Sequence, residues 1–204
     1  RWMKRGVTGA HSQESAAVEN TVKRIIMEIG ARGDEAVHEF SSKFDNWARD
    51  NYRLTDTEVQ ACIDQMSNRD LQDIEFAQAQ VRKFAQIQRS SMKEVEVETM
   101  PGVVLGHRHI PINAAGCYVP GGKYPLLASA HMSVITAKVA GVSRVITCAP
   151  PFEGKPAAAI VAAQALAGAD EIYCIGGVQA IAAMALGTES IRPVDMLIGP
   201  GNAF

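Results

Sequence analysis

The sequence predicts an α/β protein in which a helical segment precedes a Rossmann-like open parallel sheet. Two observations predict it. The composition changes near residue 100, from polar with a helical period to rich in Ala, Gly, Val and Ile. Beyond that point, four short apolar segments alternate with segments of helical length, as in βαβ units. We therefore expect two regions: residues 1–94, a helical region that packs on the sheet, and residues 95–204, the sheet domain.

The bulk composition excludes several classes of protein. Of the 204 residues, 47% are hydrophobic and 21% charged, and the net charge of -2 gives no electrostatic reason to expect nucleic acid or an anionic membrane as partner. No run of ~18 apolar residues is present that could span a bilayer. The cysteines lack the CxxC spacing of a structural zinc site, and three lie in apolar segments, which favours reduced thiols and a cytoplasmic location. They are Cys62, Cys117, Cys148 and Cys174.

Apolar residues in the first region repeat at the spacing of one helix face. These repeats predict helices around 18–29, 36–44 and 71–84. We expect the first helix to end at Gly30 and Gly33. The segment from Thr55 to Glu58 fits a capping box, so another helix should begin there. The apolar stripes are interpreted as core and the charged faces as solvated.

Two short segments then alternate as half-buried strands do, at 95–97 and 107–112, with a turn signal at Pro101 and Gly102 between them. His107 and His109 would share one face of a strand, which could suggest a metal site. No third ligand is evident, so solvent-facing strand residues are the preferred interpretation.

The second region has a regular rhythm of strands and helices. Strands are predicted at 116–119, 144–149, 171–175 and 196–198, and helices at 126–140, 156–167 and 178–186. Pro156 suits the first turn of its helix, and Gly141, Gly168 and Gly187 fall where helices should stop. Short continuous apolar strands indicate a parallel sheet with right-handed crossovers and helices on both faces.

Three of these strands end in glycine-rich turns, at 118–122, 175–179 and 198–202, and the fourth turn is 149–152. In a parallel sheet all four turns lie at one edge, where ligands bind. Glycine lets a ligand approach the main chain, and the N-termini of the following helices suit a pyrophosphate or carboxylate. The alternative is that the glycines only form tight turns. The usual GxGxxG dinucleotide motif is absent.

These turns also carry a family resemblance. The segments 118–122, 137–142, 167–172, 176–183, 187–189 and 199–202 resemble successive motifs of histidinol dehydrogenases, in the same order and spacing. The resemblance implies an aldehyde dehydrogenase-like sheet, and oxidation of an alcohol through an aldehyde to a carboxylate with NAD and a bound zinc ion. It places NAD contacts on Tyr118, Gln179 and Asn202 and on the turn glycines Gly121, Gly122, Gly176, Gly177, Gly199 and Gly201.

Within the family, the segments 84–94, 116–118 and 123–132 look more like the branch that oxidises sulfopropanediol than like enzymes acting on L-histidinol. Arg89, Lys93 and Lys123 would suit a sulfonate, although such charges are more often solvated surface. The substrate is therefore expected to be sulfopropanediol, with L-histidinol as the alternative.

The resemblance also implies what this chain does not carry. In the family, the zinc ligands and the catalytic histidine and glutamate follow the motif at 199–202, so we expect a truncated, inactive fragment that forms a homodimer when full length. Two other readings stay open. One is an aldehyde dehydrogenase-like enzyme with Cys117 or Cys174 as nucleophile, although burial would blunt either thiol. The other is a non-catalytic nucleotide- or metabolite-binding module.

Overall fold

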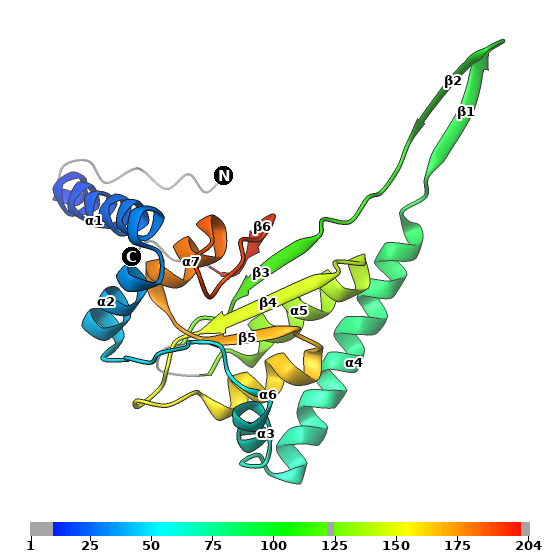
Figure 1. Cartoon of the computed structure of the whole chain (residues 1–204). Helices are drawn as coiled ribbons and strands as arrows, with labels where there is room; N and C mark the ends of the chain where they lie inside the picture. The colour runs from blue at the N-terminus through cyan, green and yellow to red at the C-terminus, as the bar shows by residue number, and fades with distance from the viewer. Residues whose placement is uncertain (1–9, 122–124, 201–204) are drawn as a thin grey trace.

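The computed structural model describes residues 10–121 and 125–200, with side chains from residue 16 onward. Its centre is a four-stranded parallel sheet in the order β5-β4-β3-β6 (Figure 1). The strands are β3 (Ala114–Tyr118), β4 (Arg144–Ala149), β5 (Glu171–Cys174) and β6 (Met196–Ile198). The predicted α/β class and parallel sheet are confirmed.

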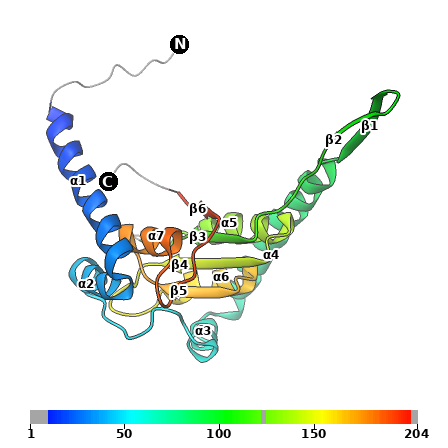
Figure 2. The same ribbon diagram turned by 45° about the horizontal axis from the view of Figure 1, so that its top comes forward.

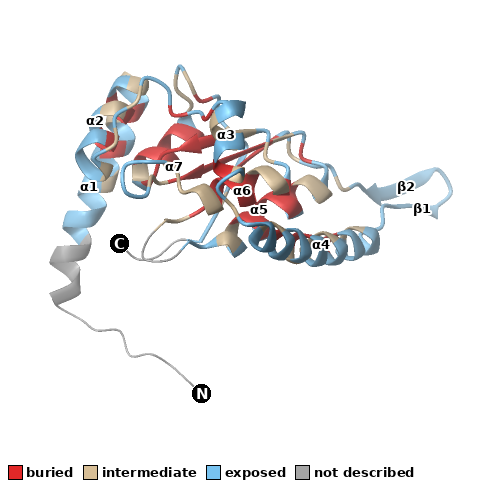
Figure 3. Ribbon diagram, turned by 90° about the horizontal axis from the view of Figure 1, so that it is seen from below, coloured by how far each residue is buried: buried red, intermediate tan, exposed pale blue. Residues whose placement is uncertain are grey.

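Helices cover both faces of this sheet because alternate side chains of each strand point to opposite faces. On one face, β3 packs with α5 (Leu127–Ala140), and α6 (Ala158–Ala167) lies beside α5. On the other face, Ile146 and Cys148 of β4 pack with α7 (Gly177–Leu186). Figure 3 shows the buried residues concentrated in the sheet and in the helix faces that touch it.

The predicted N-terminal helices form an outer layer on both sides. The helices α1 (Ala10–Arg32) and α2 (Asp34–Asp45) pack against α7, whereas α3 (Asp56–Ile63) and α4 (Asn68–Ser91) pack against α6 and α5 (Figure 1). The capping box at Thr55 is confirmed, since its hydroxyl accepts a hydrogen bond from the Glu58 N–H at 3.2 Å. The expected stop at Gly30 is wrong: α1 continues to Arg32, and the chain turns at Gly33, whose φ is +55°.

Element ends in the sheet region agree with the pattern, with two corrections. Gly141 and Gly168 end α5 and α6 in the left-handed conformation, as expected for helix stops. Pro156 does not lie in the first turn, because α6 begins only at Ala158. The first parallel strand begins at Ala114, two residues before the expected start. None of the helices in the described ranges has both the length and the apolar composition needed to cross a bilayer.

A hairpin projects from the end of α4, away from the sheet (Figure 2). Its strands, β1 (Val95–Met100) and β2 (Val103–His107), pair antiparallel, and every residue in them is exposed. The prediction of half-buried strands here was therefore wrong, as was the placement of the second strand at 107–112. In β1 the alternation is real, because Val95 and Val97 share one face and Val97 pairs with Leu105, but no described residue covers this apolar face.

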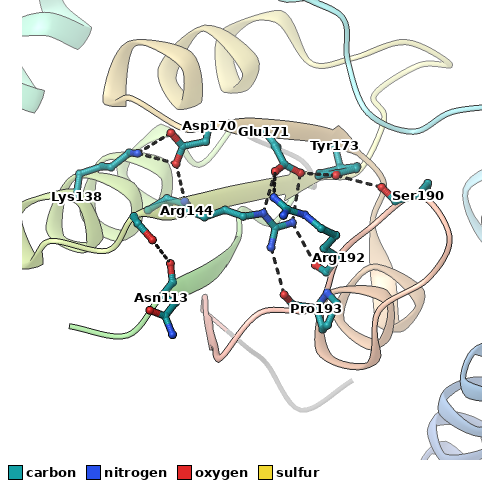
Figure 4. Close-up of polar contacts among 11 residues, drawn as sticks. Asn113, Lys138, Arg144, Asp170, Glu171, Tyr173, Ser190, Arg192 and Pro193 are labelled. Carbon is teal, nitrogen blue, oxygen red and sulfur yellow. Dashed lines mark hydrogen bonds and ion pairs between the residues drawn. The ribbon is translucent and has the colours of Figure 1, made fainter. Parts of the chain in front are cut away.

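A polar network holds together the amino-terminal edge of the sheet (Figure 4). Arg144, at the start of β4, binds Glu171 at the start of β5 and also donates to the backbone carbonyls of Arg192 and Pro193. The Asp195 carboxylate accepts hydrogen bonds from the N–H groups of Asn113 and Ala114, at 3.0 and 2.8 Å. These contacts fix the segment that leads into β6, and so place β6 beside β3.

Candidate functional site

The strand order reverses between β3 and β6. The chain runs outward from β3 through β4 to β5, then returns to place β6 on the other side of β3. Open α/β sheets bind ligands at such a reversal, beyond the carboxyl ends of the strands. A crevice of about 770 Å³ opens here, between the ends of β3 and β6, the start of α7 and the helix α1. The topology alone therefore identifies this crevice as the candidate site.

The crevice has apolar walls and a small number of polar groups. Ile181 and Ala185 of α7 and Leu197 of β6 contribute apolar walls, and Gly177 and Gly199 expose main chain to the crevice. This combination of apolar surface with a few placed polar groups is typical of small-molecule sites.

Tyr118, a predicted site residue, lines the crevice at the end of β3. Its hydroxyl oxygen accepts a hydrogen bond from the Gly177 N–H, at 3.3 Å, so that it links the end of β3 to the start of α7. Burial raises the pKa of the phenol, against the opposing effect of the Gly177 hydrogen bond. The phenol therefore stays neutral and can donate its proton to a ligand atom.

Two of the predicted turn glycines are required by packing. A Cβ on Gly121 would lie 2.3 Å from Pro150 Cγ, and one on Gly176 would lie 2.5 Å from Pro150 Cβ. Pro150, in the turn after β4, thus fits between the turns that follow β3 and β5. At Gly121 and Gly176, packing against Pro150 therefore explains the glycine without a ligand, in keeping with the alternative interpretation.

The other two predicted turn glycines within the described residues are Gly199 and Gly177. They allow neighbouring atoms to lie close to the main chain where it lines the crevice. A Cβ on Gly199 would lie 2.7 Å from the Tyr118 carbonyl oxygen, so only glycine lets the end of β6 pass against β3. Gly177 has a φ of +65°, which favours glycine, and a Cβ there would lie 2.6 Å from Gln179 Oε1. Both glycines line the crevice.

Gln179, the second predicted site residue, is 1% exposed and turns its amide towards α2. Its Nε2 donates to Asp45 Oδ2 at 2.9 Å. Both side chains line a second pocket of about 400 Å³, which shares Gly177 and Val178 with the crevice. Gln179 therefore lines the second pocket and is not among the residues that line the crevice, whereas its neighbours Gly177 and Val178 line both.

Asp45 was missed by the sequence analysis. Burial raises the pKa of this carboxyl, and hydrogen bonds from the Gln179 side chain and the Gly176 backbone oppose that rise. Asp45 is the last residue of α2 and belongs to no motif, and its contact with Gln179 spans 134 positions of the chain. No local signal could have identified it.

The remaining predicted residues either fall outside the described residues or lie away from the crevice. Gly122, Lys123, Gly201 and Asn202 lie outside the described residues. Arg89 lines a separate groove between α4 and α5, together with Arg82 and Lys138. The structure thus brings Tyr118 near Gln179 through Gly177, but it places Arg89 away from the crevice.

Comparison with known proteins identifies the family to which this chain belongs. The sequence model described as histidinol dehydrogenase matches residues 9–204. The chain belongs to the histidinol dehydrogenase family.

Relatives and a solved structure agree with this membership. The chain is 61% identical over 190 residues to "Histidinol dehydrogenase homolog 1" of Mesorhizobium japonicum, covering 93% of this chain and 38% of the relative. It is 42% identical to "Sulfopropanediol 3-dehydrogenase" of Ruegeria pomeroyi, covering 94% and 44%. The crystal structure of histidinol dehydrogenase from Elizabethkingia anophelis matches with a TM-score of 0.87 and 33% identity, over 98% of this chain and 45% of that one. The chain thus spans less than half the length of these relatives.

Zinc, which the family resemblance implies, has no donor set in the described part of this chain. No group of three or more His, Cys, Asp or Glu side chains gathers there in a geometry that could hold a metal ion. His107, the last residue of β2, and His109, just after it, lie with ring centroids 5.3 Å apart, and the His107 ring also contacts the Lys93 carbonyl. The described residues therefore do not fit zinc, and we derive no step through it.

The cysteines of this family member are poor nucleophiles. All four are buried. Burial raises the pKa of Cys117 to about 11 and that of Cys174 to about 12. Because the thiolate is the reactive form, these shifts argue against a thiol-based mechanism at either residue.

Proposed function

We propose that the whole protein oxidises a primary alcohol through an aldehyde to a carboxylate with NAD, and that this chain supplies the crevice that holds NAD. The observation that carries the proposal is the crevice at the strand reversal between β3 and β6, in a chain that belongs to the histidinol dehydrogenase family. The family is named for an oxidoreductase. The crevice has the position and lining that a dinucleotide requires.

Three features of the crevice support the binding of NAD. Ile181 and Leu197 offer apolar surface to a flat ring, and the Tyr118 hydroxyl lies at the junction of β3 and α7. The first turn of α7 begins at Gly177, whose N–H is bound to the Tyr118 hydroxyl, so the contribution of α7 to a nearby phosphate comes from its helix dipole. We propose contacts from Tyr118, from Gln179 through its carbonyl oxygen, and from Asn202.

The chemistry also needs groups outside the described residues. When bound, NAD would supply the hydride acceptor. Neither a zinc donor set nor a base for the alcohol proton is found among residues 10–121 and 125–200 at the crevice. We propose that both belong to the part of the whole protein that its relatives have and this chain does not span. The role of this chain is to bind and orient the cofactor.

We propose sulfopropanediol as the substrate, with L-histidinol as the second candidate. A relative named for sulfopropanediol is 42% identical, and relatives named histidinol dehydrogenase are up to 40% identical, so identity alone separates them little. The sequence departures at 84–94 and 123–132 support the first. Arg89 does not supply a sulfonate contact at the crevice, because it lines the groove between α4 and α5.

We also propose that the whole protein forms a homodimer. The hairpin β1–β2 exposes an apolar face that includes Val97 and Leu105, which are 50% and 56% exposed. An isolated two-stranded hairpin is at best marginally stable in water. A second copy of the protein would cover this face.

The test is a substrate panel on the whole protein, with sulfopropanediol and L-histidinol side by side and NADH formation as the readout. We expect turnover of sulfopropanediol. We also expect Tyr118→Ala to raise the KM for NAD roughly tenfold, since it removes a ring and a hydrogen bond. Tyr118→Phe keeps the ring and should have the smaller effect. Saturable NAD binding without oxidation of any alcohol would instead support the non-catalytic binding module.

A further inference from the structure

We propose that Asp45 is a positioning residue of the cofactor site, which holds the Gln179 amide in the one orientation that presents its carbonyl oxygen to Gly177, a residue that lines the crevice. The proposal rests on the proposed function, because it assigns Asp45 a role through a residue proposed to contact NAD. Asp45 itself lines the second pocket and not the crevice.

The chemistry of the contact fixes the amide. An ionised carboxylate can only accept hydrogen bonds, so the Gln179 NH₂ group must face Asp45, at 2.9 Å. The whole amide lies against Gly177, and the carbonyl oxygen Oε1 is its nearest atom, 2.6 Å from the position of an added Cβ, with Nε2 at 3.0 Å. Without Asp45, the amide could turn over and present a donor in place of an acceptor.

The helix that carries Asp45 is fixed at both ends to the segments that flank α7. At the start of α2, the Glu189 carboxylate accepts a hydrogen bond from the Asp34 N–H at 2.8 Å. The Ser190 hydroxyl donates to the Asp34 carboxylate at 2.9 Å. At the end of α2, Asp45 meets Gln179 in the first turn of α7. Asp45 is therefore held at a defined place relative to the start of α7.

The location of Asp45 is otherwise unfavourable. An acidic side chain in the last turn of a helix opposes the helix dipole, and partial burial adds a desolvation cost. Only its contacts with the Gln179 side chain and the Gly176 backbone compensate. The carboxylate is thus held at the N-terminus of α7, where the helix dipole favours negative charge, and there it orients the Gln179 amide.

The experiment uses the whole protein and steady-state kinetics with NAD varied, comparing Asp45→Ala, Asp45→Asn, Gln179→Ala and the double variant Asp45→Ala/Gln179→Ala. We expect Asp45→Ala to raise the KM for NAD roughly tenfold, with kcat changed less than about twofold. Asp45→Asn should recover most of the affinity, because its carbonyl can still accept from Gln179. The double variant should be no worse than Gln179→Ala. Glu39→Ala, an exposed change on the same helix, is the matched control and should leave KM unchanged.

The outcomes separate this inference from the proposed function. If Gln179→Ala leaves the KM for NAD unchanged, the proposed NAD contact of Gln179 is wrong. If Gln179→Ala raises KM but Asp45→Ala does not, or if the two effects add, the positioning role of Asp45 alone is overturned. A lower melting temperature with an unchanged KM would show a purely structural residue. If Asp45→Ala does not fold, Asp45→Glu, which displaces the carboxylate by one methylene, takes its place with the same expected rise in KM.

Discussion

Arg144 and Glu171 face each other at the starts of adjacent parallel strands, and the guanidinium donates to both carboxylate oxygens, at 2.8 and 3.3 Å (Figure 4). The two side chains are only 14% and 11% exposed. The Tyr173 hydroxyl donates to the same carboxylate at 2.7 Å. Arg144 also binds the carbonyls of Arg192 and Pro193, which lie in the segment that leads into β6. The ion pair, at the amino-terminal edge of the sheet, therefore helps to place β6, which forms one wall of the crevice at the carboxyl-terminal edge.

Removing the Glu171 carboxylate should destabilise the fold strongly. Glu171→Ala leaves a mostly buried guanidinium and a phenol without their acceptor, and breaking one side of a buried pair costs about 3–5 kcal/mol. Urea unfolding of the whole protein measures this loss. The control is Glu19→Ala: its ion pair with Lys23 has side chains 63% and 64% exposed, and its loss should cost less than about 1 kcal/mol. Equal losses in the two variants would contradict a special role for Glu171.

The same carboxylate predicts a pH dependence. Burial acts to raise the pKa of Glu171, but hydrogen bonds from Arg144 and Tyr173 and the nearby positive charges outweigh it and lower the pKa to about 2. A carboxyl with a lowered pKa in the folded state stabilises fully above its ordinary pKa of 4.5, and this contribution is lost as the pH falls from 4.5 towards 2. The urea midpoint of the wild type should therefore fall more steeply over this window than that of Glu171→Gln. If the urea midpoints of the two proteins fell in parallel with pH, Glu171 would be excluded as the source of the pH dependence.

The thiols should react slowly in the native protein. Burial raises the pKa of Cys117 to about 11 and that of Cys174 to about 12, so almost no thiolate is present at neutral pH. We expect iodoacetamide to modify Cys117 and Cys174 only after denaturation, as measured by mass spectrometry of the digested protein. Rapid modification of either thiol in the folded protein would revive the cysteine-nucleophile alternative.

A buried contact between α4 and α5 gives a further prediction. The Gln78 amide donates to the Ala163 carbonyl at 2.9 Å and lies 3.1 Å from His131 Nδ1, and both side chains are buried. With Gln78 as donor, His131 must be neutral, in keeping with a pKa that burial lowers. Gln78→Ala should cost about 1–3 kcal/mol of stability in urea unfolding, since two buried acceptors lose their partner. The exposed Gln80→Ala should change stability by less than about 0.5 kcal/mol, and a similar loss in both would refute the assignment.

The sequence predicted the fold because local signals and the global fold agree here. Helical periodicity, the Thr55 capping box and the glycine stops at Gly141 and Gly168 are local features, and the structure confirms each. The burial of the hairpin was predicted wrongly because its local pattern does not record tertiary contacts. Alternation shows that Val97 and Leu105 share an apolar face, but it cannot show whether anything covers that face.

The sequence predicted the position of a site residue only where that position depends on the carboxyl ends of the parallel strands. Tyr118 could be placed because the carboxyl ends of parallel strands meet at one edge. The packing of Gly121 and Gly176 against Pro150 and the contact of Gln179 with Asp45 depend on tertiary approach between distant segments. No pattern within a single segment records such an approach, so the sequence could not distinguish a glycine that serves packing from one that serves a ligand.

The most direct test of the crevice is to fill it. Ala185 is an exposed residue of α7 that lines the crevice, and Ala140, at the end of α5, is also exposed but does not line the crevice. The dissociation constant of NAD should be measured by isothermal titration calorimetry for the whole protein with Ala185→Trp or Ala140→Trp. We predict that Ala185→Trp weakens binding at least roughly tenfold through overpacking, while Ala140→Trp binds as the wild type does. Wild-type affinity in Ala185→Trp would contradict the claim that NAD occupies this crevice.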